Sequence, residues 1–119
     1  MSNVSIVRGT LKTIRAEQIT VGGEVPDLTG WAAFAQIRRK SFDGLDLVLD
    51  LSEIPGAITI ADPATAPAVV LTLGADVTRD LPADTLLASV KIQDTGSPEV
   101  VHEIARLSIE IIESPTVLP

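Results

Sequence analysis

The sequence contains no cysteine and few aromatic residues, and both shortages narrow the functions it can have. Without cysteine, neither a disulfide framework nor a thiolate-ligated metal site can form. Aromatic residues make up 3% of the 119 positions, and tyrosine is absent. Because sugars and single-stranded nucleic acids are commonly bound on aromatic platforms, this shortage counts against both ligand classes.

Positive charge is also scarce. Nine lysine and arginine residues face 16 aspartate and glutamate residues, which gives a formal net charge of −7. The only run of cations is Arg38, Arg39 and Lys40. A chain with this charge repels a polyanion, so we predict that it does not bind nucleic acid.

Long apolar runs are missing as well. The first ten residues lack the apolar stretch of a signal peptide, and the most apolar region, residues 56–75, is interrupted by Asp62, Pro63 and Pro67. We therefore predict no membrane segment and a protein that is made in the cytoplasm.

What the sequence does contain is a strong period-2 alternation of apolar and polar residues, and apolar residues make up 45% of the chain. Turn signals recur about every eight to twelve residues, which is the pattern of a β-sandwich of seven or eight strands. We predict one domain over residues 1–119 with short terminal tails. Strands are expected at 4–14 (one long or two short, around Gly9), 18–21, 33–39, 45–51, 54–60, 69–73, 86–93 and 100–112, with a helical turn or tight loop within 74–82.

Alternation also predicts which side chains face the core. The clearest row is Leu45, Leu47, Leu49 and Leu51, with Asp46, Val48 and Asp50 pointing outward. Further inward rows are expected at Ala33, Ala35 and Ile37, at Leu86, Ala88, Val90 and Ile92, and at Ala105, Leu107, Ile109 and Ile111.

Candidate chemistry is sparse. His102, the only histidine, is expected on the outward row of the last strand with Arg106, Ser108 and Glu110, and no G-x-S-x-G setting provides a nucleophile. Two groups of aspartates could provide oxygen ligands for calcium, but they lack the EF-hand spacing. The pair Gly22-Gly23 lacks the lysine of a phosphate loop. The two groups are Asp43, Asp46 and Asp50, and Asp76, Asp80 and Asp84. We predict no catalytic, cofactor-binding or metal site, and thus no enzyme.

The remaining candidates are residues for contact with another protein. Apolar side chains beside arginine on the outward rows are typical of protein interfaces. The alternative is that a second layer covers them, or that they are ordinary scatter on the surface. The residues are Phe34, Arg38, Arg39, Ile104 and Ile112.

Several short motifs occur in an order that resembles a known family. "IVRGTLKTIRAEQITV" is followed by "PDLTGWAAFAQIRRK", and then by "GLDLVLDLS", "GAITIAD", "AVVLTLGADVTRDLPADT" and "LLASVKIQDTGSPEVVHEIARLSIEI". From about residue 6 to residue 114, this order is similar to the N-terminal domain of the phage baseplate upper protein. That domain is an immunoglobulin-like β-sandwich found in tailed-phage structural proteins.

The resemblance implies an all-β, immunoglobulin-like antiparallel sandwich and a non-enzymatic structural role in the virion of a tailed bacteriophage, at the head, neck or tail. Its implied partners are other virion proteins, with the chain present in many copies or as a homo-oligomer. The tails 1–5 and 114–119 are expected to serve as binding arms. No receptor-binding segment follows the domain in this sequence, which favours the head or neck. The alternative is a calcium-assisted adhesive or ligand-binding sandwich on a cell surface.

Overall fold

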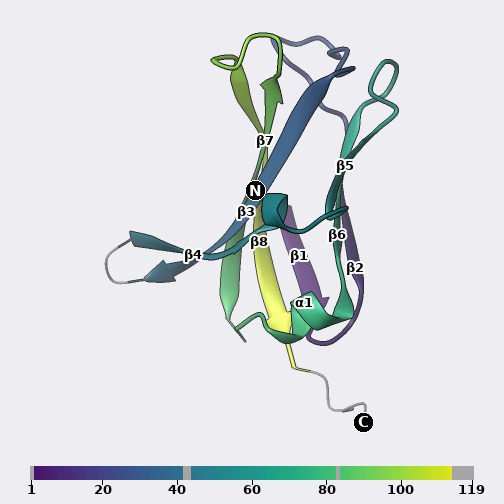
Figure 1. Cartoon of the computed structure of the whole chain (residues 1–119). Helices are drawn as coiled ribbons and strands as arrows, with labels where there is room; N and C mark the ends of the chain where they lie inside the picture. Colours follow the sequence, from purple (N-terminus) through teal and green to yellow (C-terminus); the bar gives the residue numbers. More distant parts are fainter. Residues whose placement is uncertain (1, 42–43, 83, 114–119) are drawn as a thin grey trace.

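The structure, a computed structural model, describes residues 2–41, 44–82 and 84–113 and consists of two β-sheets packed face to face (Figure 1). In spatial order, the larger sheet contains β1 (Ser2–Val7), β8 (Val101–Ile112), β7 (Thr85–Asp94), β3 (Trp31–Ser41) and β4 (Gly44–Asp50). The smaller sheet contains β2 (Lys12–Ala16), β6 (Ala68–Leu73) and β5 (Ile58–Ala61). The predicted strand at 4–14 is therefore two strands that lie in different sheets.

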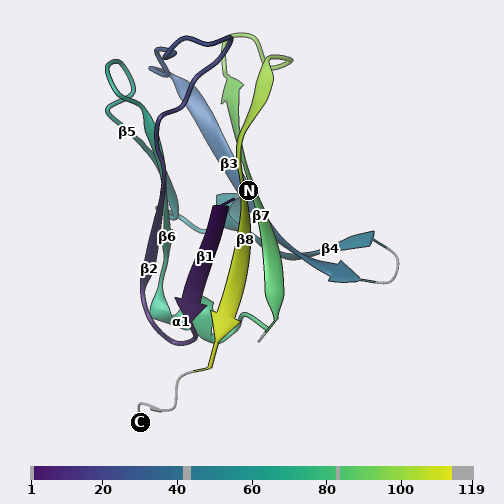
Figure 2. The same ribbon diagram turned by 180° about the vertical axis from the view of Figure 1, so that it is seen from behind.

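The order of the strands is that of an immunoglobulin-like sandwich, in which strands B, E and D form one sheet and C, F and G form the other. Here β2, β6 and β5 take the places of B, E and D, while β3, β7 and β8 take those of C, F and G. β4 extends the larger sheet as the additional strand of variable-type domains does. The predicted all-β, immunoglobulin-like class is confirmed. One pair departs from the antiparallel expectation, because β1 runs parallel to β8 (Figure 2).

The core lies between the two sheets and is built from aliphatic side chains that alternate along the strands. The inward row of β7 is confirmed: Leu86, Ala88, Val90 and Ile92 are all buried. From the smaller sheet, Ile14, Val69, Leu71 and Leu73 close on the same core. Burying a large aliphatic side chain contributes roughly 1.5–3 kcal/mol, so these rows stabilise the packing of the two sheets.

The connections at one end of the sandwich are joined by a buried hydroxyl. The short helix α1 (Ala75–Arg79) confirms the helical turn expected between β6 and β7. Within it, Thr78 is fully buried, and its hydroxyl donates a hydrogen bond to the Thr10 carbonyl at 2.7 Å. Because Thr10 lies between β1 and β2, this bond ties two loops that are far apart in the sequence.

Two strand predictions were wrong in whole or in part. Residues 18–21 do not form a strand: Gln18 has a positive φ of 56° that turns the chain, and Val21 makes only an isolated bridge with Glu24. The strand predicted at 54–60 begins later, at Ile58, because a 3-10 helix, η1 (Leu51–Glu53), and a turn precede it.

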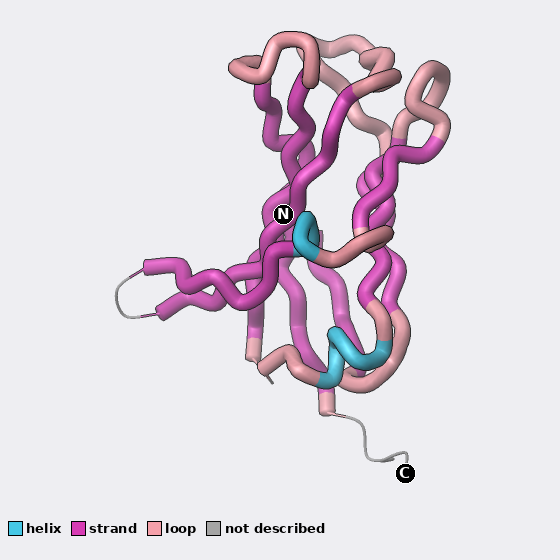
Figure 3. Tube along the Cα trace, in the orientation of Figure 1, coloured by secondary structure: helices cyan, strands magenta, loops and turns pink. Residues whose placement is uncertain are grey.

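The predicted leucine row in β4 was also wrong, and a β-bulge explains why. Ile37 is paired with Leu49, but its neighbour Arg38 is paired with Leu47, so Val48 is one extra residue in β4. A bulge changes which face the following side chains occupy. Leu51 is buried and Leu49 half-buried, whereas Leu45 and Leu47 are 50% and 52% exposed. Strands β3 and β4 project together on the side away from the smaller sheet (Figure 3).

A second bulge corrects the predicted positions of His102 and Ile104. Val90 is paired with Ala105 but Lys91 with Glu103, which leaves Ile104 as the extra residue in β8. Beyond the bulge, His102 is paired with the buried Ile92 and shares its inward face. Ile104 packs against the core. Neither residue lies on the outward row where alternation had placed it, although the inward row of Leu107, Ile109 and Ile111 is confirmed.

The N-terminal arm was a further misassignment. Ser2 to Ser5 are part of β1 and are paired with residues 107–110 of β8, so this segment is an integral edge of the larger sheet. Met1 and the predicted C-terminal arm at 114–119 lie outside the described residues.

Candidate interaction surface

The larger sheet exposes apolar side chains on the face that points away from the smaller sheet, which we call the outer face. Strand register places six of the eight large exposed hydrophobic residues of the described chain there. These six are Val7, Phe34, Leu45, Leu47, Val101 and Ile112. The other two, Leu11 and Val25, lie in loops. By contrast, the outward positions of the smaller sheet include Thr13, Thr59 and Thr72.

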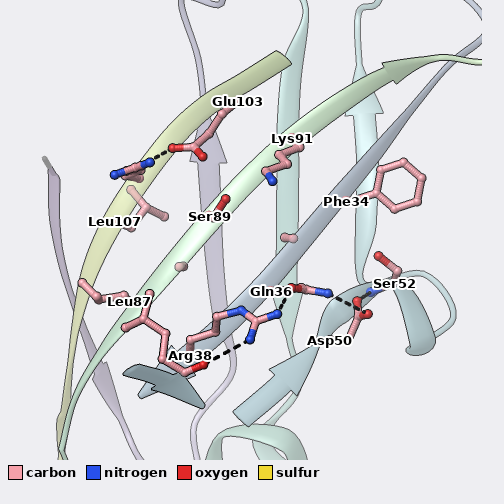
Figure 4. A pocket seen from close by; sticks show the side chains of 14 residues that line it. Phe34, Gln36, Arg38, Asp50, Ser52, Leu87, Ser89, Lys91, Glu103 and Leu107 are labelled. Atoms are coloured by element: carbon pink, nitrogen blue, oxygen red, sulfur yellow. Dashed lines mark hydrogen bonds and ion pairs between the residues drawn. The ribbon is translucent and has the colours of Figure 1, made fainter. Parts of the chain in front are cut away.

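A groove of about 600 Å³ crosses the outer face (Figure 4). Its floor is formed by outward side chains of β7 and β8, and the β3–β4 hairpin forms a wall because it bends away from the sandwich. The lining is mixed, with apolar residues beside charged ones. It includes Phe34, Gln36, Arg38, Leu45, Asp50, Ser52, Leu87, Ser89, Lys91, Glu103, Arg106 and Leu107.

A chain of hydrogen bonds fixes the hairpin wall. Arg38 donates to the side-chain oxygen of Gln36 at 2.7 Å and to the carbonyl of Leu45 at 3.3 Å. Gln36 in turn donates to the Asp50 carboxylate at 3.2 Å. The other oxygen of Asp50 accepts the backbone N–H of Ser52 at 3.0 Å, which caps η1. This last bond is the main reason that the pKa of Asp50 is lowered, and Arg38 adds a smaller contribution.

On the opposite side of the groove, Arg106 donates to Glu103. The pair lowers the pKa of Glu103, chiefly through that hydrogen bond, and keeps the carboxylate ionised. On a regular strand, residues three apart point to opposite faces. The bulge at Ile104 brings Glu103 and Arg106 to the same face.

The outer face differs from the whole chain in its charge. Among the described residues, strand register assigns it more cations than carboxylates, although the chain as a whole has 16 acidic and nine basic residues. The cations are Arg38, Lys40, Lys91 and Arg106, and the carboxylates are Asp50, Glu103 and Glu110.

Of the five predicted interface residues, the groove brings two together. Phe34 and Arg38 both line it. Arg39 is opposite Asp46 on the other face of the hairpin. Ile104 packs against the core, and Ile112 is exposed on the outer face at the end of β8, beside Val7.

Leucines 45 and 47, together with Lys91, Glu103 and Arg106, were missed as members of this surface. Alternation does assign Lys91 to the outward side of β7 and Arg106 to the outward side of β8, so the signal for these two residues was present in the sequence. The two leucines and Glu103 depend on the bulges, for which simple alternation provides no signal.

The structure describes all but one of the residues considered for chemistry. His102 stacks on Trp31, with ring centroids 6.2 Å apart and planes inclined by 19°. Within residues 2–41, 44–82 and 84–113, no three acidic or histidine side chains are grouped so that they could hold a metal ion. Asp43 lies outside these ranges. Gly22 and Gly23 have positive φ angles and form the turn between Val21 and Glu24.

Comparisons with known proteins identify no family for this chain. No family model matches the chain, and no curated protein sequence matches it. Among solved structures, the chain is similar to the BTLA ectodomain, with 13% sequence identity and a TM-score of 0.45 over 92% of this chain and 89% of that one. Because this likeness is loose, the fold assignment depends on the strand order described above. No helix in the described part of the chain is long and apolar enough to cross a bilayer.

Proposed function

We propose that this chain is a non-enzymatic structural protein of a tailed bacteriophage virion that acts by docking to other virion proteins. The observation that carries the docking role is the concentration of exposed apolar side chains on the outer face of the larger sheet. The phage context comes from the order of sequence motifs, which resembles the baseplate upper protein domain.

The chemistry of the outer face supports assembly over catalysis. An interface needs apolar area for affinity and polar groups at its margin for register, and the groove combines Phe34 and Leu45 with Arg38 and Glu103. The polar groups that line it are largely engaged with one another, which fits a preformed docking surface. In a virion, repetition of one modest interface by symmetry produces a stable assembly.

Quantitative mass spectrometry of purified phage particles tests this proposal. We expect the chain in many copies per particle, at a number that is a multiple of the symmetry order of its site. Its absence from particles would refute the virion role. The cell-surface alternative is tested separately by thermal unfolding with calcium and with chelator. We expect the same Tm in both, and a Tm that rises with calcium would favour the adhesive sandwich.

A further inference from the structure

We propose that the outer face binds the outer face of a second copy of this chain, in a two-fold symmetric dimer whose axis runs along β7. This inference builds on the proposed function, in that it takes the outer face as an assembly surface, and it names the occupant. Three independent features of the described residues lead to it: the position of the exposed hydrophobic residues, the distribution of charge, and the shape of the hairpin.

Four of the six exposed hydrophobic residues lie at the two margins of the outer face. Leu45 and Leu47 lie at the hairpin margin, whereas Val7 and Ile112 lie at the margin formed by β1 and β8. A two-fold axis along the central strand β7 places the hairpin margin of each copy over the β1–β8 margin of the other. The leucines at the hairpin margin of each copy then contact Val7 and Ile112 of the other copy. By symmetry the dimer contains this apolar contact twice.

Charge favours the same arrangement. A molecule with a net charge of −7 repels its own copies, so self-association requires a surface where carboxylates do not predominate. The outer face is such a surface. Its hairpin margin carries Lys40 on β3, which has no carboxylate partner among the ion pairs of the described residues. It also carries Arg38, whose charge acts on Asp50 without forming an ion pair with it. The opposite margin carries Glu110 on β8, also without such a partner.

Strand register puts these opposite charges at the same height. Arg39 is paired with Leu86 and Thr85 with Glu110, so Lys40, one residue beyond Arg39, is level with Glu110 along the strands. Because an axis along β7 preserves height, Lys40 of one copy approaches Glu110 of the second copy. The contact occurs twice at the same height, once at each of the two margins of the interface.

The hairpin supplies the third argument. It bends away from its own sandwich (Figure 1) and forms the wall of the groove (Figure 4). Side chains on both of its faces are exposed, Lys40 and Leu45 on the outer face and Arg39 and Asp46 on the other. In the proposed dimer, each hairpin reaches around the edge of the other copy's sheet. This arrangement gives the projecting hairpin a function, because it would bury Leu45 and Leu47, which are half exposed in the single chain.

Sedimentation of the full chain across micromolar to millimolar concentrations tests the dimer. We expect a monomer–dimer equilibrium that Leu47→Glu weakens by about tenfold or more, because it places a charge in the apolar contact. Leu11→Glu is the matched control: it introduces the same charge at a residue that is 66% exposed in a loop, and we expect a change within about twofold. A native chain that stays monomeric, forms a larger oligomer, or loses affinity equally in both variants overturns the proposal.

A charge exchange tests the two-fold geometry. Lys40→Glu and Glu110→Lys should each weaken the homodimer, because each creates like-charge contacts. An equimolar mixture of the two variants should recover a heterodimer in native mass spectrometry. In that heterodimer the two substituted positions carry opposite charges and meet at one end, and the native lysine and glutamate meet at the other. No recovery overturns the geometry.

The dimer and the virion role can fail separately. A monomeric chain that is still found in phage particles would refute this dimer and leave the virion role intact. A dimer that is absent from particles would do the reverse.

Discussion

Strands β7 and β4 both alternate apolar with polar side chains, yet the apolar row is buried in β7 and largely exposed in β4. β7 lies between β8 and β3 and faces the smaller sheet, and its row from Leu86 to Ile92 is buried. β4 is an edge strand whose residues before the bulge at Val48 project away from the sandwich, and its leucines at 45 and 47 are half exposed. Alternation therefore sets the face on which a side chain lies, but burial also requires an opposing layer to cover that face.

This difference separates two uses of the same residue type. Leu86 in β7 stabilises the fold, whereas Leu45 and Leu47 in β4 are available to a partner. Substitutions at buried and exposed positions test this difference, because each changes the free energy of unfolding by a different amount.

The largest effect is expected for Leu86→Ala. Leu86 is 0% exposed and belongs to the core cluster, so its truncation should lower the free energy of unfolding by about 2–5 kcal/mol. Urea denaturation followed by circular dichroism measures this loss. A change below about 1 kcal/mol would mean that the smaller sheet does not cover β7 as described.

Thr78→Val should have the next largest effect. The substitution keeps the shape of a fully buried side chain but removes the hydroxyl that donates to the Thr10 carbonyl. Leaving that part-buried acceptor without its partner costs about 1–3 kcal/mol. Thr72→Val, at an exposed threonine on the outward side of β6, is the control, and it should leave the denaturation midpoint nearly unchanged.

Asp50→Ala should cost about 1 kcal/mol, because Asp50 caps η1 and anchors the base of the hairpin. Asp50→Asn keeps an acceptor for Ser52 but removes the charge. Since the pKa of Asp50 is lowered in the folded protein, its ionised form stabilises the fold. This contribution is complete above the usual value of 3.8 and disappears as the pH falls through the folded-state pKa.

The stability difference between the native chain and Asp50→Asn should therefore be largest near neutral pH and shrink in acid. Denaturation series at several pH values measure it. A difference that grows as the pH falls would contradict the lowered pKa.

The smallest effect is expected for Leu47→Ala. Although it removes the same atoms as Leu86→Ala, Leu47 is 52% exposed on the outer face, and the free energy of unfolding of the monomer should change by less than about 0.5 kcal/mol. The measurement is made at low protein concentration so that association does not contribute. A loss comparable to that of Leu86→Ala would show that the hairpin tip is packed against its own sandwich.

Much of the fold could be predicted from the sequence because central strands obey period 2 closely. The row in β7 and the lower part of β8 were placed correctly, since regular ladders on both sides hold their alternation in phase. The bulges at Val48 and Ile104 could not be predicted, because an extra residue changes the phase without leaving a distinctive residue type. The turn at Gln18 was missed for a related reason: a non-glycine residue with positive φ carries no local signal.

The candidate site was less predictable than the fold. Phe34 and Arg38 were found because they keep the phase of β3, whose own alternation is regular. Leu45, Leu47 and Glu103 were missed because their faces depend on pairing with distant strands. A surface assembled from β3, β4, β7 and β8 requires the register of all four, and the sequence of one strand does not specify it.

The parallel pairing of β1 with β8 bears on how the chain reaches this structure. Ser2 lies beside Leu107 and Val7 beside Ile112, so each contact in this pair spans about a hundred residues of chain. Contacts of such high sequence separation require large loops to close before they stabilise anything, and proteins rich in them fold in milliseconds to seconds. β1 has no other strand partner in the described structure, so it cannot join the sheet until β8 has formed. During that interval, the core side of β1, including the fully buried Ile6, is open to solvent and to other chains.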